Sequence, residues 1–486
     1  MSILDEAVMV DDPPRRDWSE YQGNIFEAVH KQFDNLIVQA VAGSGKTTTL
    51  VEATTFVSGS ALFLAFNKGI AEELRSRTSI DCKTMNALGH QVWRQEMPHA
   101  KLDAKKLDSI IARFPDESFR KEFGYTIKRA VGLAKNCAFG IGREAELQDF
   151  AELIDSYLDV DSTRLQDVAL ASLSVFEQSL SELETFDFDD QLYVPLAQGW
   201  AYPTYWTVFV DECQDLSPIQ HLMLANMQTL GSRIIAVGDR NQAIYGFRGA
   251  AHDSMDLLKS RFSMVELPLS ISYRCAQRIV EEAQMYSEHI QARPNAPLGA
   301  VRYTRDDEAD PEIFVNQLIL CRNNAPMFRA IMRHIRQRKP CRVLSNFLEG
   351  FQGFIRKFKG EDTRAIRQQL DKWYLKEKES AENKGFRGKV AALADKYETV
   401  ALFCEEYRTK QEILDTVYKL SQCATGPLFS TIHKAKGLEH QSVHILRPDL
   451  MPAFYATSKE QLQQESNLTY VAITRAIDNL TWGERR

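Results

Sequence analysis

The sequence lacks several features that would assign it at once to a class of protein. No apolar run approaches the ~20 residues that a membrane-spanning helix needs, and the acidic start, MSILDEAVMVDDPP, has no signal-peptide core. The eight cysteines form no C-x-x-C pair, which argues against a zinc ribbon and fits a reducing compartment. Short-period repeats and low-complexity tracts are missing too, which argues against a repeat protein.

The chain also lacks an excess of positively charged residues. The chain has 59 Lys and Arg against 66 Asp and Glu, a net charge of −7. Composition therefore gives no support to nucleic-acid binding, and any such surface has to be a local basic groove. The 486 residues exceed one ordinary core, so we expect two to four domains. Hydrophobic residues at 44% and charged residues at 26% are typical of a globular protein.

Short apolar runs alternate with amphipathic segments in two blocks. We expect strands at 36–41, 61–66, 207–212 and 233–239, and again at 316–322, 340–345, 428–433 and 442–446. Strands that alternate with helices indicate parallel sheets. Two charged segments with a helical pattern, 89–185 and 346–423, interrupt the blocks. The sequence thus predicts an α/β fold with two parallel sheets, each interrupted by a mainly helical insert.

The segment LIVQAVAGSGKTTTLV, residues 36–51, predicts a phosphate-binding loop. An apolar strand ends in two glycines whose backbone can curl around an anion, and a helix should follow. In such a loop Lys46 reaches the β- and γ-phosphates and the Thr47 hydroxyl binds Mg²⁺. Ala40 stands where the usual G-x-x-x-x-G-K-[ST] pattern begins with glycine. A glycine-rich turn before a helix is therefore the alternative interpretation.

Two acids follow a predicted buried strand in TVFVDECQDLSP. Ligands of open α/β sheets bind at the carboxyl ends of strands, so Asp211 can hold Mg²⁺ and Glu212 can activate an attacking water. The alternative is an acidic pair that caps the next helix. A phosphate-binding loop in the same sheet favours the catalytic interpretation.

The segment VGDRNQAIYGFRGA follows another apolar strand. Gln242 is placed to sense a γ-phosphate by a hydrogen bond. Tyr245 and Phe247 supply aromatic faces nearby, and bases stack on such faces at ~1–3 kcal/mol each. The alternative is that both rings belong to the core.

Together, these and other segments resemble the UvrD/PcrA/Rep type of superfamily 1 DNA helicase over nearly the whole chain. In chain order the segments are SEYQGNIFEAV, AVAGSGKTTTL, LAFNKGIAEEL, TMNALGH, FDFDDQL, DECQD, GDRNQAIYGFRGA, LSISYRC, STIHKAKGLEH and LTYVAITRAIDNL. One such segment alone means little. The whole series in the family order makes coincidence negligible.

The resemblance implies two RecA-like cores with ATP and Mg²⁺ in the cleft between them. The residues implied in catalysis are Lys46, Asp211, Glu212 and Gln242 from the first core, and Arg274 and Arg475, the arginine finger, from the second. The residues implied to hold the nucleotide are Gln22, Ala42, Gly43, Ser44, Gly45, Lys46, Thr47, Thr48, Tyr273 and Glu439. Tyr273 would stack on adenine, Glu439 would lie near the ribose, and Thr47 and Asp211 would hold the Mg²⁺.

The resemblance also implies a nucleic-acid partner. The residues implied to contact DNA are Phe66, Asn67, Thr84, His90, Tyr245, Phe247, Arg248, Thr431 and His433. The expected partners are single-stranded DNA and single/double-strand junctions, together with a protein partner in repair, recombination or defence. We expect a location in the cytoplasm of a bacterial or phage-infected cell, or in the nucleus if the source is eukaryotic.

We expect core 1 at residues 1–88 and 186–265, with insert 1 at 89–185. Core 2 is expected at 266–345 and 424–486, with insert 2 at 346–423. Insert 2 is short for the family and no nuclease segment follows TWGERR, so a short form is expected. Two local departures are Ser272, where the family has asparagine, and His440, where it usually has phenylalanine.

Insert 2 carries a basic stretch at 356–389, with eleven Lys or Arg against six Asp or Glu. One interpretation is a contact with duplex phosphates. The other is a solvated helical face with i,i+4 ion pairs.

The sequence leaves three functions open. The first is an ATP-dependent helicase that moves on single-stranded DNA and unwinds duplex, with 3′→5′ polarity implied by resemblance alone. The second is a single-strand translocase that strips proteins or recombinase filaments. The third is a DNA-sensing ATPase subunit of a repair or defence complex.

Overall fold

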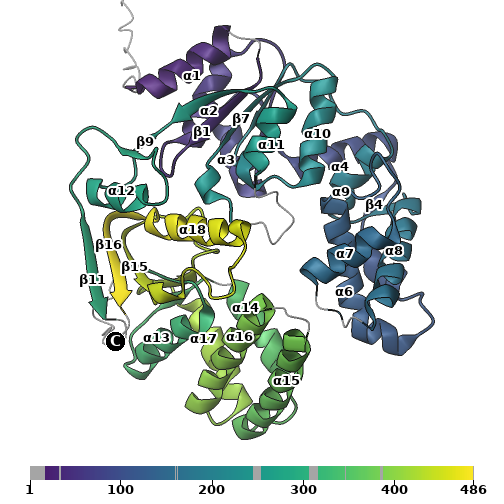
Figure 1. The fold of residues 1–486 in the computed structure, drawn as a ribbon, viewed down its shortest axis with the longest axis vertical. Coiled ribbons are helices and arrows are strands. Elements are labelled where there is room, and N and C mark those ends of the chain that lie inside the picture. Colours follow the sequence, from purple (N-terminus) through teal and green to yellow (C-terminus); the bar gives the residue numbers. More distant parts are fainter. Residues whose placement is uncertain are drawn as a thin grey trace, which may run out of the picture.

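The computed structural model describes residues 17–31, 34–158, 160, 163–244, 253–305, 316–344, 346–383 and 387–484. Two large sheets each contain six strands, and every pairing within them is parallel. The first sheet has the order β3-β2-β6-β7-β1-β8 and the second the order β11-β16-β15-β12-β14-β13. The predicted α/β fold with two parallel sheets is confirmed (Figure 1).

The eight predicted strands lie close to their expected positions, whereas β3, β8, β11 and β16 were not predicted. The first sheet contains β1 (Leu36–Ala40), β2 (Ala61–Ala65), β3 (Asp81–Thr84), β6 (Thr207–Val210), β7 (Arg233–Gly238) and β8 (Val265–Leu269). The second contains β11 (Ala300–Arg305), β12 (Leu318–Cys321), β13 (Arg342–Val343), β14 (Leu428–Thr431), β15 (His440–Leu446) and β16 (Ala476–Glu484). Two small pairs are β4 (Lys101–Leu102) with β5 (Thr185–Phe186), and β9 (Ile271–Ser272) with β10 (Gln291–Ala292).

Burial explains which strands the sequence predicted. The strands β1, β2, β6 and β7 are almost entirely buried, so each is largely apolar. The edge strands β3 and β8 were missed because their sequences, DCKT and VELPL, are polar or contain proline. Proline is tolerated at a sheet edge, where its missing N–H costs no ladder hydrogen bond.

The helices of the two cores cover the sheets (Figure 1). Core 1 carries α1 (Glu20–Lys31), α2 (Lys46–Ala53), α3 (Lys68–Arg77), α4 (Met85–Glu96), α9 (Asp190–Ala197), α10 (Pro218–Thr229) and α11 (Ser254–Arg261). Core 2 carries α12 (Gln277–Gln284), α13 (Asn324–Arg336) and α18 (Lys459–Ile473). Within the described residues, we find no helix whose length and apolar character would let it cross a bilayer.

Insert 1 is a helical group at one side of the molecule (Figure 1), formed by α5 (Lys106–Ile111), α6 (Glu117–Asn136), α7 (Leu147–Tyr157) and α8 (Leu165–Ser181). Buried ion pairs tie it to core 1. Lys106 Nζ and Lys135 Nζ, from α5 and α6, lie 2.8 Å and 2.6 Å from the two carboxylate oxygens of Asp190 in α9. All three side chains are at most 1% exposed, so insert 1 is anchored to core 1 by charges that water does not reach.

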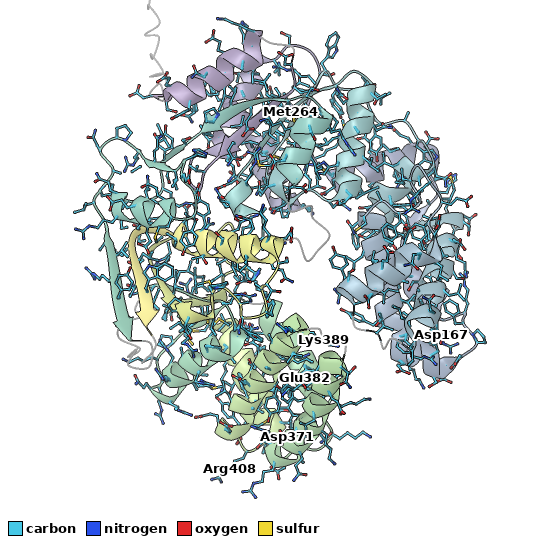
Figure 2. The ribbon with its side chains drawn as sticks, in the orientation of Figure 1. Asp167, Met264, Asp371, Glu382, Lys389 and Arg408 are labelled. Atoms are coloured by element: carbon cyan, nitrogen blue, oxygen red, sulfur yellow. The ribbon has the colours of Figure 1, made fainter. Side chains whose placement is uncertain are left out.

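Insert 2 consists of α14 (Asn346–Arg356), α15 (Thr363–Asn383), α16 (Arg387–Glu406) and α17 (Lys410–Gln422). It shares a hydrophobic core with core 2, because Phe328 of α13 packs on Phe351 and Phe403 with ring centroids 6.1 Å and 5.5 Å apart. In Figure 2, Lys389 lies at the end of insert 2 near core 2, and Asp371 lies toward the opposite end.

Three of the expected domain limits fall inside regular elements. The limit at 88/89 lies within α4, the limit at 185/186 lies within β5, and the limit at 265/266 lies within β8, which pairs with β1 in the first sheet. The domain division itself stays a prediction.

Candidate functional site

The loop between β1 and α2 has the backbone that a phosphate-binding loop requires. Gly43 has φ 72° and Gly45 has φ 79°, both in the left-handed region that favours glycine. A Cβ atom on Gly43 would lie 2.5 Å from Cβ of Arg274 and 2.9 Å from Oγ of Ser272. Because α2 begins at Lys46, the unpaired N–H groups of its first turn adjoin the loop and can attract an anion. The loop of core 1 is therefore packed directly against core 2.

Three other predicted loop residues hold the loop in shape. The N–H of Ala42 donates to the Tyr470 hydroxyl of α18 at 3.0 Å. The Ser44 hydroxyl donates to the carbonyl three residues earlier at 2.8 Å. The Thr48 hydroxyl accepts from Arg77 at 3.1 Å. Ala42 and Ser44 are fully buried, so their part in the loop is to hold its shape.

The two acids that follow β6 face the loop. The Thr47 hydroxyl donates to Asp211 Oδ2 at 2.6 Å, which brings together two hard oxygen donors of the kind that Mg²⁺ prefers. Glu212 has φ 52°, a left-handed conformation that is unusual for a residue with a side chain. Its carboxylate lies 3.5 Å from Lys46 Nζ. Such strained backbone is found at functional sites when the surrounding structure enforces it.

The pKa values of the two acids, Asp211 and Glu212, are shifted in opposite directions. Burial and the neighbouring Glu212 charge raise the pKa of Asp211 to about 6. Burial also opposes ionisation of Glu212, but Lys46 and Lys436 outweigh it and hold the pKa of Glu212 below its ordinary value. Burial alone would lower the pKa of Lys46, yet the nearby carboxylates raise it. At neutral pH, Glu212 is therefore a carboxylate and Lys46 a cation.

The expected adenine end of the site is built around Gln22, which is 4% exposed. Its side-chain amide donates to Thr49 at 3.0 Å and accepts from the N–H of Ser19 at 3.0 Å. The Tyr273 hydroxyl donates to the same amide oxygen at 3.3 Å, and the Tyr273 side chain is 40% exposed. Gln22 and Tyr273 thus meet across the boundary between the cores. The Tyr273 ring remains partly exposed, so a flat ligand can stack on it.

The two predicted arginines differ in their surroundings. Arg274 forms an ion pair with Glu439 at 2.6 Å, so two predicted site residues of core 2 lie side by side. Arg475 is 1% exposed and donates to a carbonyl of α18, to the carbonyl of Leu438 and to the Thr474 hydroxyl, all in core 2. Burial and the Arg274 charge lower the pKa of Arg475 to about 10, which still leaves it protonated at neutral pH.

Several residues of the site were missed from the sequence. The Gln242 amide donates to Asp239 Oδ2 at 2.8 Å, and Asp239 is fully buried. The Gln214 amide donates to Glu212 Oε2 at 2.5 Å and so helps to orient that carboxylate. Lys436 of core 2 donates to the carbonyl of Gln242 at 2.6 Å. The missed residues are Asp239, Gln214 and Lys436, which lie within the segments GDRNQ, DECQD and STIHKAKGLEH. Their polar side chains, next to residues already assigned to the site, were the feature of the sequence that could have indicated them.

Four predicted DNA-contact residues of core 1 lie at the carboxyl ends of β2 and β3 or in the segments that follow them. Phe66 is 47% exposed. Asn67 caps α3 by accepting from a backbone N–H at 3.0 Å, and Thr84 caps α4 in the same way at 3.1 Å. His90 accepts from Arg94 at 3.3 Å, and burial together with the Arg94 charge lowers its pKa. The other core 1 residues of this set, Tyr245, Phe247 and Arg248, lie outside the described residues.

Thr431 and His433, the predicted DNA contacts of core 2, line a cavity of about 340 Å³ at the carboxyl ends of β12 and β14. Arg322 lines the same cavity. Its guanidinium lies 2.7 Å from Glu465 and donates to the Tyr455 hydroxyl at 2.6 Å, which fixes its position. The structure therefore brings these two predicted residues together and adds an arginine.

A larger cavity of about 1100 Å³ lies between the inserts. Arg129 and Tyr125 of α6 line it from insert 1, and Arg387 and Lys389 of α16 line it from insert 2. Tyr157, at the end of α7, adds a second ring. Cations beside exposed tyrosines suit phosphates and bases.

Comparison with known proteins supports one family. Residues 22–263 match the model of the UvrD/REP helicase N-terminal domain, and residues 327–483 match that of the UvrD-like helicase C-terminal domain. The two matches cover most of the chain.

Relatives are distant in sequence. The F-box DNA helicase protein 1 of Schizosaccharomyces pombe is 24% identical over 97% of this chain and 58% of its own. A probable DNA helicase of Mycoplasma pneumoniae is 23% identical over 90% of this chain and 78% of its own. DNA helicase IV of Escherichia coli is 26% identical over 55% of this chain and 47% of its own. Among solved structures, the arterivirus nonstructural protein 10 helicase aligns over 95% of this chain and 62% of its own with 12% identity and a TM-score of 0.34.

Proposed function

The chain belongs to the UvrD/REP helicase family, and from that premise we propose that it hydrolyses ATP to move along single-stranded DNA and unwind duplex DNA. The polarity we propose is 3′→5′. The proposed substrates are ATP with Mg²⁺, single-stranded DNA and single/double-strand junctions.

One observation carries this proposal: residues of both cores meet around the loop at Gly43. Core 1 contributes Lys46 and Glu212, 3.5 Å apart. Core 2 contributes Tyr273, whose backbone N–H donates to the Gly43 carbonyl at 2.9 Å, and Arg274, which touches the same glycine. A nucleotide at this loop would contact both cores at once, so its binding and hydrolysis can move one core relative to the other.

Each residue of the site has a chemical task in hydrolysis. Lys46 neutralises the phosphates, and Glu212, held as a carboxylate, accepts the proton of the attacking water. Arg274 and Arg475 stabilise the charge that develops on the transferred phosphoryl group. Thr47 and Asp211 would hold Mg²⁺, which supplies further charge neutralisation when bound. Gln242, positioned by Asp239, reports whether the γ-phosphate is present.

The surfaces for DNA lie outside this cleft. Phe66 supplies an exposed ring at the end of β2, and Thr431 and His433 line the cavity next to Arg322. The cavity between the inserts adds Arg129 and further cations. Although the chain is acidic overall, cations and aromatic rings lie together at these two cavities. This is the local basic surface that binding of a polynucleotide requires.

The test compares three activities of the purified protein. We expect ATP turnover to require Mg²⁺ and to rise with added single-stranded DNA, and we expect a forked duplex to be unwound. Displacement of streptavidin from a biotinylated single strand without unwinding would instead favour a protein-stripping translocase. DNA-stimulated turnover with neither activity would favour an ATPase that senses DNA, and turnover indifferent to DNA would refute all three.

A further inference from the structure

The loop that follows β14 reaches three separate places with side chains spaced three residues apart. His433 lines the cavity that contains Arg322. Lys436 contacts core 1, and Glu439 forms the ion pair with Arg274 at 2.6 Å. Turns stiffen the loop, because the N–H of Ala435 donates to the Thr431 carbonyl at 3.0 Å. If bound DNA displaces His433, this short, hydrogen-bonded segment can therefore transmit the displacement to Lys436 and Glu439.

Lys436 makes two contacts with core 1. Its Nζ donates to Asp215 Oδ2 at 2.5 Å and to the carbonyl of Gln242 at 2.6 Å. The side chain of Lys436 is 10% exposed and that of Asp215 is 2% exposed, so this ion pair is largely removed from water. One cation of core 2 thus contacts both the segment that carries the acids and the segment that carries the proposed γ-phosphate sensor.

Asp215 lies in the short 3₁₀ turn Cys213–Asp215, directly after Glu212. Gln214 in the same turn donates to Glu212 Oε2 and accepts from the backbone N–H of Asp239 at 3.0 Å. Asp239 in turn holds the amide of Gln242. A shift of Lys436 that moves Asp215 therefore moves the groups that orient both Glu212 and Gln242.

We propose that Lys436 is a positioning residue through which a DNA strand bound to core 2 sets the geometry of Glu212 and Gln242. The inference rests on the proposed function and adds a route for DNA stimulation of ATP turnover. The ammonium group of Lys436 donates to two oxygens of core 1, and Lys436 is not among the residues that line the cavity beside His433.

Lys436→Met removes the cation and keeps a similar length of side chain. We measure the turnover number and KM for ATP with and without a poly-dT oligonucleotide, and the Kd of a fluorescent oligonucleotide without ATP. The stimulated turnover number should fall by about tenfold or more, the factor expected from loss of one charge-assisted hydrogen bond. KM for ATP and Kd should each stay within about threefold, because hydrogen-bonding groups elsewhere hold both ligands.

Three further variants separate positioning from general damage. Lys436→Arg keeps the charge and should restore much of the stimulation. Lys410→Met removes another lysine that pairs with a carboxylate, Glu361 at 3.6 Å, and should leave stimulation intact. Asp215→Asn should resemble Lys436→Met, and the double variant should be no slower than the slower single one, since the two residues act as one unit.

Several results would overturn the inference. A weaker Kd with a salt dependence shallower by ~0.7 would mean that Lys436 binds a phosphate directly. Equal losses with and without DNA, or multiplied losses in the double variant, would remove the coupling role. Should Lys436→Met not fold, Asp215→Asn breaks the same pair from core 1 and decides by the same measurements. A wild-type protein without any DNA stimulation would refute the proposed function itself.

Discussion

The carbonyl of Gly43 accepts a hydrogen bond from the backbone N–H of Tyr273 at 2.9 Å, and this bond joins the phosphate-binding loop of core 1 to core 2. The contact depends on the absence of a side chain, because a Cβ atom at Gly43 would lie 2.5 Å from Cβ of Arg274. The loop that we propose to bind the nucleotide is thus also part of the interface between the cores. A change in how the cores approach each other must alter the loop.

Gly43→Ala should therefore disturb both the loop and the interface. The new methyl group meets Arg274 and also forces a residue with a side chain to φ 72°, at a cost of ~1–3 kcal/mol for the backbone alone. We expect weaker ATP binding and a loss of DNA-stimulated turnover. The matched control is Gly142→Ala in insert 1, where φ is 86° and no atom lies within 4 Å of the added Cβ. Equal effects of both variants on KM for ATP would show that the interface contact is unimportant.

Glu212→Gln should stop hydrolysis without preventing ATP binding. The amide cannot accept the proton of water, and loss of a general base lowers rates by ~10²–10⁴. Lys46→Ala should abolish turnover by removing the phosphate cation itself. Equilibrium binding of a fluorescent ATP analogue separates the two, because Glu212→Gln should bind it and Lys46→Ala should not. Normal turnover in Glu212→Gln would assign the base to another residue.

Arg475→Ala should slow turnover far more than it weakens nucleotide binding, by ~10³–10⁵ if the side chain acts as an arginine finger. The structure adds an effect on stability, because all three acceptors of its guanidinium lie in core 2 and the side chain is buried. Thermal melting should therefore fall in this variant. Arg274→Ala is the comparison, since its side chain is 19% exposed and its ion-pair partner, Glu439, is 52% exposed. A stable Arg475→Ala protein with near-normal turnover would exclude the finger role.

Local patterns in the sequence predicted the buried strands and the loop at Gly43. Only the resemblance to a family, and no local pattern, assigned Arg274 and Arg475 of core 2 to the same cleft. The buried strands were predicted because each is an apolar run, and the nucleotide loop because its residues are consecutive. The contact between Lys436 and Asp215 joins positions 221 residues apart, and no local pattern encodes it. The sequence also does not show that Asn67 and Thr84 cap helices, because the side chains that cap a helix are the same ones that bind phosphate.

Asp190→Ala tests how insert 1 is anchored. The change leaves Lys106 and Lys135 buried without the carboxylate they share, and breaking a buried pair in this way costs ~3–5 kcal/mol. The control is Asp108→Ala, which breaks an exposed pair with Lys128 and should cost no more than ~1 kcal/mol. Chemical denaturation followed by tryptophan fluorescence measures both. A cost for Asp190→Ala as small as that of the control would mean that the charges do not anchor the insert.

The structure favours the cavity between the inserts over the exposed face of α15 as the place where insert 2 contacts DNA. Within the basic stretch, Arg367 already pairs with Asp371 at 3.0 Å and Lys378 with Glu382 at 3.5 Å, as on a solvated helical face. Arg387, by contrast, lines the cavity of about 1100 Å³ opposite Arg129 of insert 1. The cavity is thus the better candidate for a phosphate contact.

Replacing both cavity arginines, Arg129 and Arg387, with glutamine should weaken binding to forked DNA. The plot of log affinity against log salt should become shallower by ~0.9 per lost duplex contact, or by ~0.7 per lost single-strand contact. The matched control replaces Arg364 and Arg367 of α15 with glutamine, which removes the same charge from the same protein. The comparison needs forked and single-stranded substrates across a salt series. Equal losses on both substrates would place the cavity on the single-strand path, and a larger loss in the control would return the contact to α15.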